Sequence, residues 1–187
     1  TALCGPFDNA IIPKNSEKMD WEVELAVVIS KKASYISEEE ALNYVAGYSI
    51  MNDYSEREWQ LQKDGGQWDK GKSADTFAPL GPYLILPQNV GDPHNLNLWL
   101  KVNGKVMQAA NTKDMIFKVA KLISYTSHHM TLLPGDIIST GTPSGVGSGQ
   151  KPPQFLKAGD EVELQIDKIG TQKQKVVSFS GSQSEKK

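Results

Sequence analysis

The chain has 187 residues, 39% of them hydrophobic, and a chain of this length usually folds as one globular domain with a buried core. Its 20 basic and 22 acidic residues give a formal net charge of -2, which excludes a general positive field for nucleic acid or anionic lipid. Because no apolar run reaches the ~20 residues of a membrane span and Cys4 is the only cysteine, we expect a soluble intracellular protein, cytoplasmic or in the mitochondrial matrix, without disulfides.

Strict alternation of polar and apolar residues between Asp20 and Ile29 predicts a β-strand. Its polar face carries Asp20, Glu22 and Glu24. Its apolar face carries Trp21, Val23, Leu25, Val27 and Ile29. One face of this strand is therefore expected to enter the core.

Two capping boxes follow this strand. The first, Ser37 to Glu40, predicts a short helix to about Val45, closed by Gly47, with a strand over 48–52. The second, Ser55 to Glu58, predicts a helix to about residue 62. Residues 68–82 contain several glycines and prolines and are expected to form a long ordered loop.

The second half of the chain is rich in predicted strands. We expect strands over 83–86, 96–102, 137–140, 161–167 and 175–179, with a hairpin at Asn103-Gly104. A helix is expected over 113–127, capped by Thr112, with an apolar stripe of Ile116, Val119, Ala120 and Ile123. A glycine-rich loop over 141–147 and a frayed tail over 180–187 complete the expected elements. Strands outnumber helices, so the fold class is predicted to be α+β, mainly β, with antiparallel or mixed sheets.

Glu22 and Glu24 are candidate metal ligands. Side chains two residues apart on a strand point the same way, with backbones ~6.5 to 7 Å apart, so one cation can bridge them. The competing interpretation is a solvated strand face, and Glu161 and Glu163 repeat the same spacing elsewhere in the chain. Spacing alone therefore does not indicate which of the two glutamate pairs binds a metal.

Asp53 distinguishes the first pair, because it lies where an apolar strand stops. Arg57 and Gln60 follow at positions +4 and +7, on one helical stripe if the helix includes Asp53. A carboxylate, a guanidinium and an amide suit a site for a metal and an anionic substrate, since arginine binds carboxylates bidentately. The alternative is a surface Asp-Arg pair worth under ~1 kcal/mol.

Residues 66–73 match the phosphate-binding pattern G-x-x-x-x-G-K-[ST], so a nucleotide hydrolase is a further hypothesis. The context argues against it, because a polar helix precedes the segment where a buried strand is needed, and prolines follow where a helix should begin. The pattern leaves Lys72 as a single cation in a glycine-rich loop.

Four ordered segments resemble the fumarylacetoacetate hydrolase superfamily. They are DWEVELAVVI, NDYSEREWQ, GKSADTFAPLGP and LLPGDIISTGTPSGVG, and together they cover nearly the whole chain. The later segment KPPQFLKAGDEVE is similar to the fumarylacetoacetate hydrolase domain-containing 2 branch. The resemblance implies that residues 1–187 form a single catalytic domain, a mixed β-roll that is usually dimeric.

The resemblance also implies the site. It assigns Mg²⁺, with Mn²⁺ or Ca²⁺ as alternatives, to three carboxylates, and a small 2-oxo acid to the residues around them. The metal ligands would be Glu22, Glu24 and Asp53. The substrate contacts would be Arg57, Gln60, Lys72 and Thr142, with Lys72 also catalytic.

The implied chemistry is hydrolysis of a C–C bond in acylpyruvates through a metal-chelated enolate. Decarboxylation of oxaloacetate and keto-enol tautomerisation are alternatives on the same metal platform, and a catalytically silent binding module is an alternative of another class. Hydrolytic and decarboxylating members carry a His-x-x-Glu pair on an upstream lid, and no histidine in this sequence has Glu at +3. The sequence therefore leaves the general base unassigned.

Overall fold

The computed structural model describes residues 2–180, so the tail expected to fray lies almost wholly outside the described residues. Two five-stranded sheets and a two-stranded ribbon make up the fold, with strand orders β1-β7-β5-β4-β10, β2-β12-β11-β8-β9 and β3-β6. The strands are β1 Leu3–Cys4, β2 Ala10–Ile12, β3 Met19–Asp20, β4 Val23–Ile29, β5 Val45–Asn52, β6 Ser55–Glu56, β7 Ala78–Ile85, β8 Asn97–Val102, β9 Lys105–Asn111, β10 Ile137–Ser139, β11 Glu161–Ile166 and β12 Gly170–Ser178. The described helices are α1 Arg57–Leu61, α2 Pro87–Val90 and α3 Val119–His129, with 3-10 turns η1 Ala41–Tyr44, η2 Lys63–Gly65, η3 Trp68–Gly71, η4 Thr112–Asp114 and η5 Gly147–Gly149.

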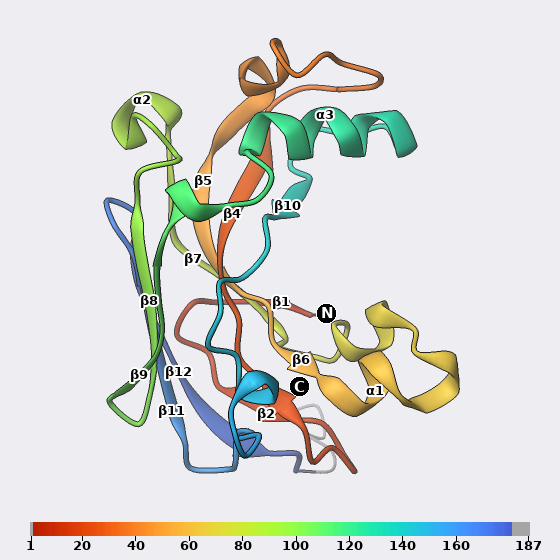
Figure 1. Ribbon diagram of the computed structural model, residues 1–187, viewed down its shortest axis with the longest axis vertical. Coiled ribbons are helices and arrows are strands. Elements are labelled where there is room, and N and C mark those ends of the chain that lie inside the picture. Colours follow the sequence, from red (N-terminus) through yellow and green to blue (C-terminus); the bar gives the residue numbers. More distant parts are fainter. Residues whose placement is uncertain (1, 181–187) are drawn as a thin grey trace, which may run out of the picture.

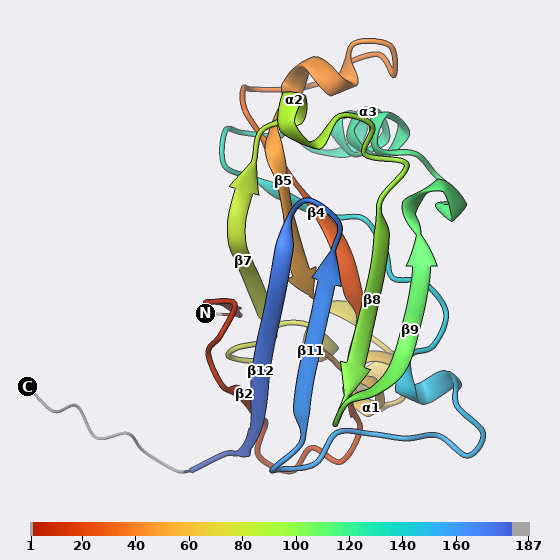
Figure 2. The same cartoon turned by 90° about the vertical axis from the view of Figure 1, so that its left-hand side faces the viewer.

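Both large sheets are mixed. Most neighbours pair antiparallel, whereas β1 pairs parallel with β7 and β2 parallel with β12. The two sheets face each other, and Figure 2 shows β12, β11, β8 and β9 in front of β5 and β4. Strands thus dominate the described structure, which confirms the predicted α+β, mainly β class with mixed sheets.

The core lies between the two sheets. The apolar face predicted for β4 is buried, with Val23, Leu25 and Val27 at most 1% exposed. They share one cluster with Leu100 on β8 and Leu164 on β11, which pair across neighbouring strands of the second sheet. Alternation along β4 and the residue before it therefore sends the apolar side chains into the core and leaves Glu22, just before β4, and Glu24 on the opposite face.

That opposite face is covered by the segment after β5. Figure 1 shows β8, β9, β11 and β12 on the left, β4 and β5 in the centre and α1 on the right. The short helix α1 packs against η3, and both lie beyond the end of β5. No helix within residues 2–180 is long and apolar enough to cross a membrane.

The hairpin at Asn103-Gly104 and the strand before the glycine-rich loop are confirmed, with both turn residues at positive φ. The expected helix after Ser37 is wrong: Ser37 does accept a hydrogen bond from the amide of Glu40, but only the 3-10 turn η1 follows. Gly47 ends no helix. It lies inside β5, where a Cβ would come 2.7 Å from the carbonyl oxygen of Ile85 on β7.

The helix expected from residue 113 begins only at Val119. The Thr112 hydroxyl that was expected to cap it accepts from the amide of Leu96, and residues 112–114 form the 3-10 turn η4. Ile116, expected on its apolar stripe, is 91% exposed. The imidazole of His94 accepts a hydrogen bond from the amide of Val119 and so caps α3. Two strands are also longer than expected, since residues 78–82 belong to β7 and β12 begins at Gly170.

A leucine pair tests the position of the core. Leu164 is 0% exposed and Leu84 is 49% exposed, both within strands. We expect Leu164→Ala to lower the free energy of unfolding by about 2 to 5 kcal/mol, because it removes buried surface and leaves a cavity. Leu84→Ala should cost less than about 1 kcal/mol, as exposed substitutions usually do. Urea denaturation measures both, and equal losses would contradict this core.

Candidate metal and substrate site

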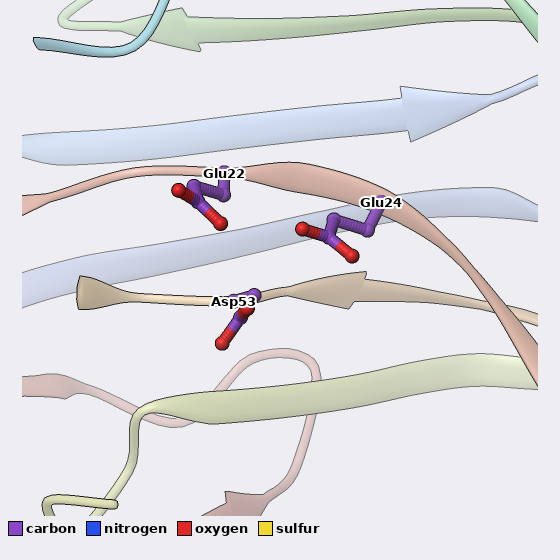
Figure 3. Close-up of side chains that lie close together, drawn as sticks. All are labelled: Glu22, Glu24 and Asp53. Atoms are coloured by element: carbon purple, nitrogen blue, oxygen red, sulfur yellow. The ribbon is translucent and has the colours of Figure 1, made fainter. Parts of the chain in front are cut away.

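All seven residues predicted for the site line one cavity of about 650 Å³. Four further residues complete its wall, namely Leu61, Trp68, Ser139 and Gly141. Figure 3 shows the side chains of Glu22 and Glu24 pointing from one strand toward Asp53 on the neighbouring segment. The structure therefore brings together residues that are up to 120 positions apart in sequence.

The pairing of β4 with β5 creates the carboxylate cluster. Val23 pairs with Asn52, and just past this pair the amide of Asp53 donates a hydrogen bond to the carbonyl of Glu22 at 2.9 Å. Glu22 and Glu24 follow the strand period, so both reach the same side as Asp53. One carboxylate oxygen from each of the three residues lies within 4.8 Å of the others. We call Glu22, Glu24 and Asp53 the carboxylate trio.

Two cations face the trio. The Lys72 ammonium lies 2.8 Å from Glu22 Oε2 and 2.6 Å from Asp53 Oδ2, so it bridges these two carboxylates. The Arg57 guanidinium donates from Nη2 to Glu22 Oε1 at 2.6 Å. Glu22 thus has a cation on each of its oxygens, which compensates for its burial.

Glu24 has a different environment. Its Oε2 accepts hydrogen bonds from the Ser139 hydroxyl at 2.5 Å and the Gly141 amide at 2.7 Å. Burial, reinforced by the nearby charge of Asp53, raises the pKa of Glu24 to about 8 despite these hydrogen bonds. Burial also raises the pKa of Asp53, although Lys72 opposes the shift. Both pKa shifts reflect burial first and the charge of neighbouring carboxylates second.

The trio fits a divalent cation. Magnesium, manganese and calcium prefer hard oxygen ligands, and three carboxylates within 4.8 Å offer them on one side of a chamber. The comparison pair Glu161 and Glu163 lies on β11, where Glu161 is exposed and forms an ion pair with Lys173 at 2.8 Å. The same sequence spacing therefore gives a cluster on β4 and a solvated strand face on β11.

Arg57 is held by a residue to which sequence reasoning assigned no role. Asp20 is 0% exposed and accepts from Arg57 Nε at 2.8 Å, while Arg57 Nη1 donates to Gln60 at 2.9 Å. Asp20 also accepts from the amides of Gly147 and Ser148. Its place in the alternation with Glu22 was the available signal, but its partners lie on α1 and η5, which are distant in sequence.

The assumed stripe from Asp53 through α1 is wrong. The helix begins at Arg57, and the side chain of Glu56 caps it by accepting from the amide of Trp59 at 2.7 Å. The second capping box therefore does not form, and Ser55 instead donates to the carbonyl of Asp53. Asp53 reaches the site from the end of β5, whereas Arg57 and Gln60 reach it from α1.

The P-loop hypothesis is not supported by the structure. Residues 66–73 follow α1 and contain the 3-10 turn η3, whereas a P-loop links a buried strand to a helix. The described hydrogen bonds of the Lys72 ammonium are with Glu22 and Asp53. Thr142 lies in the other glycine-rich segment, where its hydroxyl donates to the carbonyl of Val23 at 3.0 Å.

The mixed β-roll gathers three carboxylates, a lysine and an arginine in one chamber, and the three carboxylates could hold a metal ion. The model of the fumarylacetoacetate (FAA) hydrolase C-terminal family matches residues 1–177. The chain therefore belongs to the fumarylacetoacetate hydrolase family, whose members are hydrolases and isomerases. This confirms the resemblance that the four ordered segments indicated.

Named relatives and a solved structure agree with this assignment. The chain is 52% identical over 177 residues to oxaloacetate tautomerase FAHD2A, mitochondrial, from Bos taurus, covering 95% of the chain and 56% of that protein. It is 56% identical over 177 residues to 2,4-didehydro-3-deoxy-L-rhamnonate hydrolase from Sphingomonas sp. strain SKA58, covering 94% and 62%. The chain thus spans less than two thirds of the length of these relatives.

The solved structure is maleylpyruvate hydrolase from Sphingobium sp. SYK-6 in complex with manganese(II) ion and pyruvate. It matches this chain with a TM-score of 0.83 and 34% identity, covering 96% of this chain and 62% of that one. The match confirms the fold as that of the family's C-terminal domain.

The raised pKa of Glu24 predicts how the stability of the metal-free protein depends on pH. The folded-state pKa of about 8 exceeds the carboxyl's ordinary pKa of 4.5, so its stabilising contribution is full below about pH 4.5 and is lost as pH rises to about 8. The side chain of Glu24→Gln stays neutral at every pH. The melting temperature of this variant should therefore rise relative to that of wild type by several degrees between pH 5.5 and 8, and the difference should stay constant above pH 8.

Thermal melts in a chelating buffer measure this difference. Glu163→Gln is the matched control, because its carboxylate lies on β11 outside the chamber, and it should track wild type. A melting-temperature difference between Glu24→Gln and wild type that does not change with pH would contradict the assigned environment of Glu24.

Proposed function

We propose that this chain is the catalytic domain of a divalent-metal-dependent enzyme acting on small 2-oxo acids. The observation that carries the proposal is the carboxylate trio, with its oxygens within 4.8 Å, inside a chamber that also presents Lys72 and Arg57. Glu22, Glu24 and Asp53 would hold the ion. We favour Mg²⁺, with Mn²⁺ supported by the relative solved with that ion and pyruvate.

When bound, such an ion supplies Lewis-acid polarisation of a carbonyl and neutralises a neighbouring carboxylate. The protein's own groups would bind and orient the substrate around it. Lys72 offers an ammonium at the trio, and the Gln60 side chain lines the same chamber. Arg57 uses Nε, Nη1 and Nη2 for bonds to Asp20, Gln60 and Glu22, so its contribution includes orienting Glu22 as well as adding positive charge.

The first candidate reaction is C–C hydrolysis of an acylpyruvate-type acid. It is supported by the solved maleylpyruvate hydrolase, which shares the fold at 34% identity. The second candidate is keto-enol tautomerisation, favoured by the bovine relative named oxaloacetate tautomerase at 52% identity. Both reactions develop negative charge on the 2-oxo oxygen, which the Lys72 ammonium would stabilise. Decarboxylation of oxaloacetate and a silent binding module are further alternatives, and identifying the products distinguishes them from the first two.

The family resemblance also predicts a homodimer, which sedimentation equilibrium can check. The compartment remains a prediction of cytoplasm or mitochondrial matrix, which microscopy of the tagged protein can decide. The bovine relative carries the word mitochondrial in its name.

Calorimetric titration of Mg²⁺ and Mn²⁺ tests the metal ligands. Glu24→Gln should weaken binding at least about tenfold, the scale seen when even an outer-shell partner of a metal ligand is removed. Glu163→Gln has the same chemistry on β11 and should bind like wild type. Unchanged binding by Glu24→Gln would remove this residue from the ligand set.

Lys72→Met tests the proposed catalytic cation. We expect kcat/KM to fall about 10²-fold or more, the range found when a group that stabilises developing charge is deleted. The exposed Lys105 on β9 provides the control Lys105→Met, which should retain full turnover.

The products identify the reaction. Enol oxaloacetate reports tautomerisation by loss of its ultraviolet absorbance, maleylpyruvate reports hydrolysis by release of pyruvate, and carbon dioxide reports decarboxylation. Metal binding without any turnover would favour the silent binding module. Full activity of Lys72→Met would contradict the role assigned to this lysine.

A further inference from the structure

Gln108 connects two parts of the site from outside the chamber. It lies on β9 in the second sheet and is 1% exposed. Its Oε1 accepts a hydrogen bond from the amide of Val23 at 3.1 Å, between the two glutamates of the trio. Its Nε2 donates to the Thr142 hydroxyl and to the Pro143 carbonyl, both at 2.8 Å. One buried amide therefore joins the trio's strand to the glycine-rich loop.

The partners determine which way this amide points. The amide of Val23 can only donate and the carbonyl of Pro143 can only accept, so exchanging the oxygen and nitrogen of Gln108 would lose both bonds. Thr142 then accepts from Gln108 and gives its own proton to the carbonyl of Val23 at 3.0 Å. Its hydroxyl is thus held in a single orientation, and because its proton is committed to Val23, it anchors the loop rather than donating to an acceptor-only ligand such as a 2-oxo acid.

The loop also lies directly against β9. Gly145 has a φ of 109°, and a Cβ at this position would overlap the carbonyl oxygen of Met107. The indole of Trp21 donates to the carbonyl of Gly145 at 3.1 Å. The backbone of the glycine-rich loop is therefore seated on β9 at the residue next to Gln108, and its placement depends on this contact.

We propose that Gln108 is a positioning residue that fixes the Thr142 hydroxyl and the glycine-rich loop relative to the carboxylate trio. It acts through Thr142 and does not touch the substrate. The claim that the glycine-rich loop at Gly141 and Thr142 meets a 2-oxo acid rests on the proposed function; the claim that Gln108 holds the loop does not.

Gln172 provides a matched control. It is a second buried glutamine, 0% exposed, on β12, and its Nε2 donates to the carbonyls of Ile50, Pro79 and Gly81. None of these residues lines the chamber. Replacing either glutamine by methionine keeps the approximate length and removes comparable hydrogen bonds, so a purely structural loss should affect both variants alike.

The first measurement is hydrogen exchange of the peptide covering residues 140–147 in the Mn²⁺-loaded protein. Gln108→Met should speed exchange there about tenfold, as expected when one or two hydrogen bonds that hold a segment are lost. Gln172→Met should leave this peptide at the wild-type rate. Equal rates in wild type and Gln108→Met would overturn the proposal. If Gln108→Met does not fold, Gln108→Asn replaces it, because its amide is one methylene too short to span Val23 and Pro143.

The second measurement is pyruvate binding to the Mn²⁺-loaded protein by calorimetry. We expect Gln108→Met to weaken pyruvate binding about tenfold, the usual effect of losing an outer-shell partner, with Mn²⁺ affinity changed less than about threefold. In a Thr142→Val background the same substitution should cost less than it does in wild type, because one of the two bonds from Gln108 to the loop is already lost and only the bond to Pro143 remains.

Equal losses in both backgrounds would overturn action through Thr142. Unchanged pyruvate affinity in Gln108→Met, with wild type binding, would overturn it as well. If wild type binds Mn²⁺ but no pyruvate, the proposed function fails, and the exchange comparison alone decides whether Gln108 holds the loop.

Discussion

The need to compensate buried negative charge at one end of β4 determines how the rest of the site is arranged. Asp20, Glu22 and Glu24 are all less than 8% exposed, and uncompensated carboxylates at such positions cost several kcal/mol each. Each is compensated differently: Asp20 by backbone amides and Arg57, Glu22 by two cations, and Glu24 by Ser139 and Gly141. The segments around η3, α1 and the glycine-rich loop are thereby tied to this strand.

The sheets and the connecting segments have separate tasks. Pairing of β4 with β5 sets the spacing of the carboxylate trio, and the two packed sheets keep this pairing rigid. The segments after β5 and β10 supply the groups that would meet a ligand, including Lys72 and Thr142. Relatives named as tautomerase and hydrolase share most of this domain, which is consistent with one metal platform serving several reactions of 2-oxo acids.

Local pattern predicted part of this structure well. The alternation of β4 identified its buried face and the glutamates opposite, and Asn103-Gly104 identified a hairpin, because both depend on residues close in sequence. The first residues of the helices were less predictable. Thr112 bonds to Leu96 and does not cap α3, and Glu56 rather than Ser55 caps α1. The supporting residues could not be found from sequence: the bonds that join Asp20, Ser139 and Gln108 to Arg57, Glu24 and Thr142 span up to 115 positions.

The central claim is that Glu22, Glu24 and Asp53 together bind one divalent ion. Crystals grown with Mn²⁺ and measured above and below the manganese absorption edge test it directly, because the anomalous difference map locates the ion independently of any model. The account predicts one strong peak with an oxygen from each of the three carboxylates at about 2.0 to 2.3 Å, the distance range of divalent ion–carboxylate bonds. A peak at Glu161 and Glu163, or none at the trio, would contradict it.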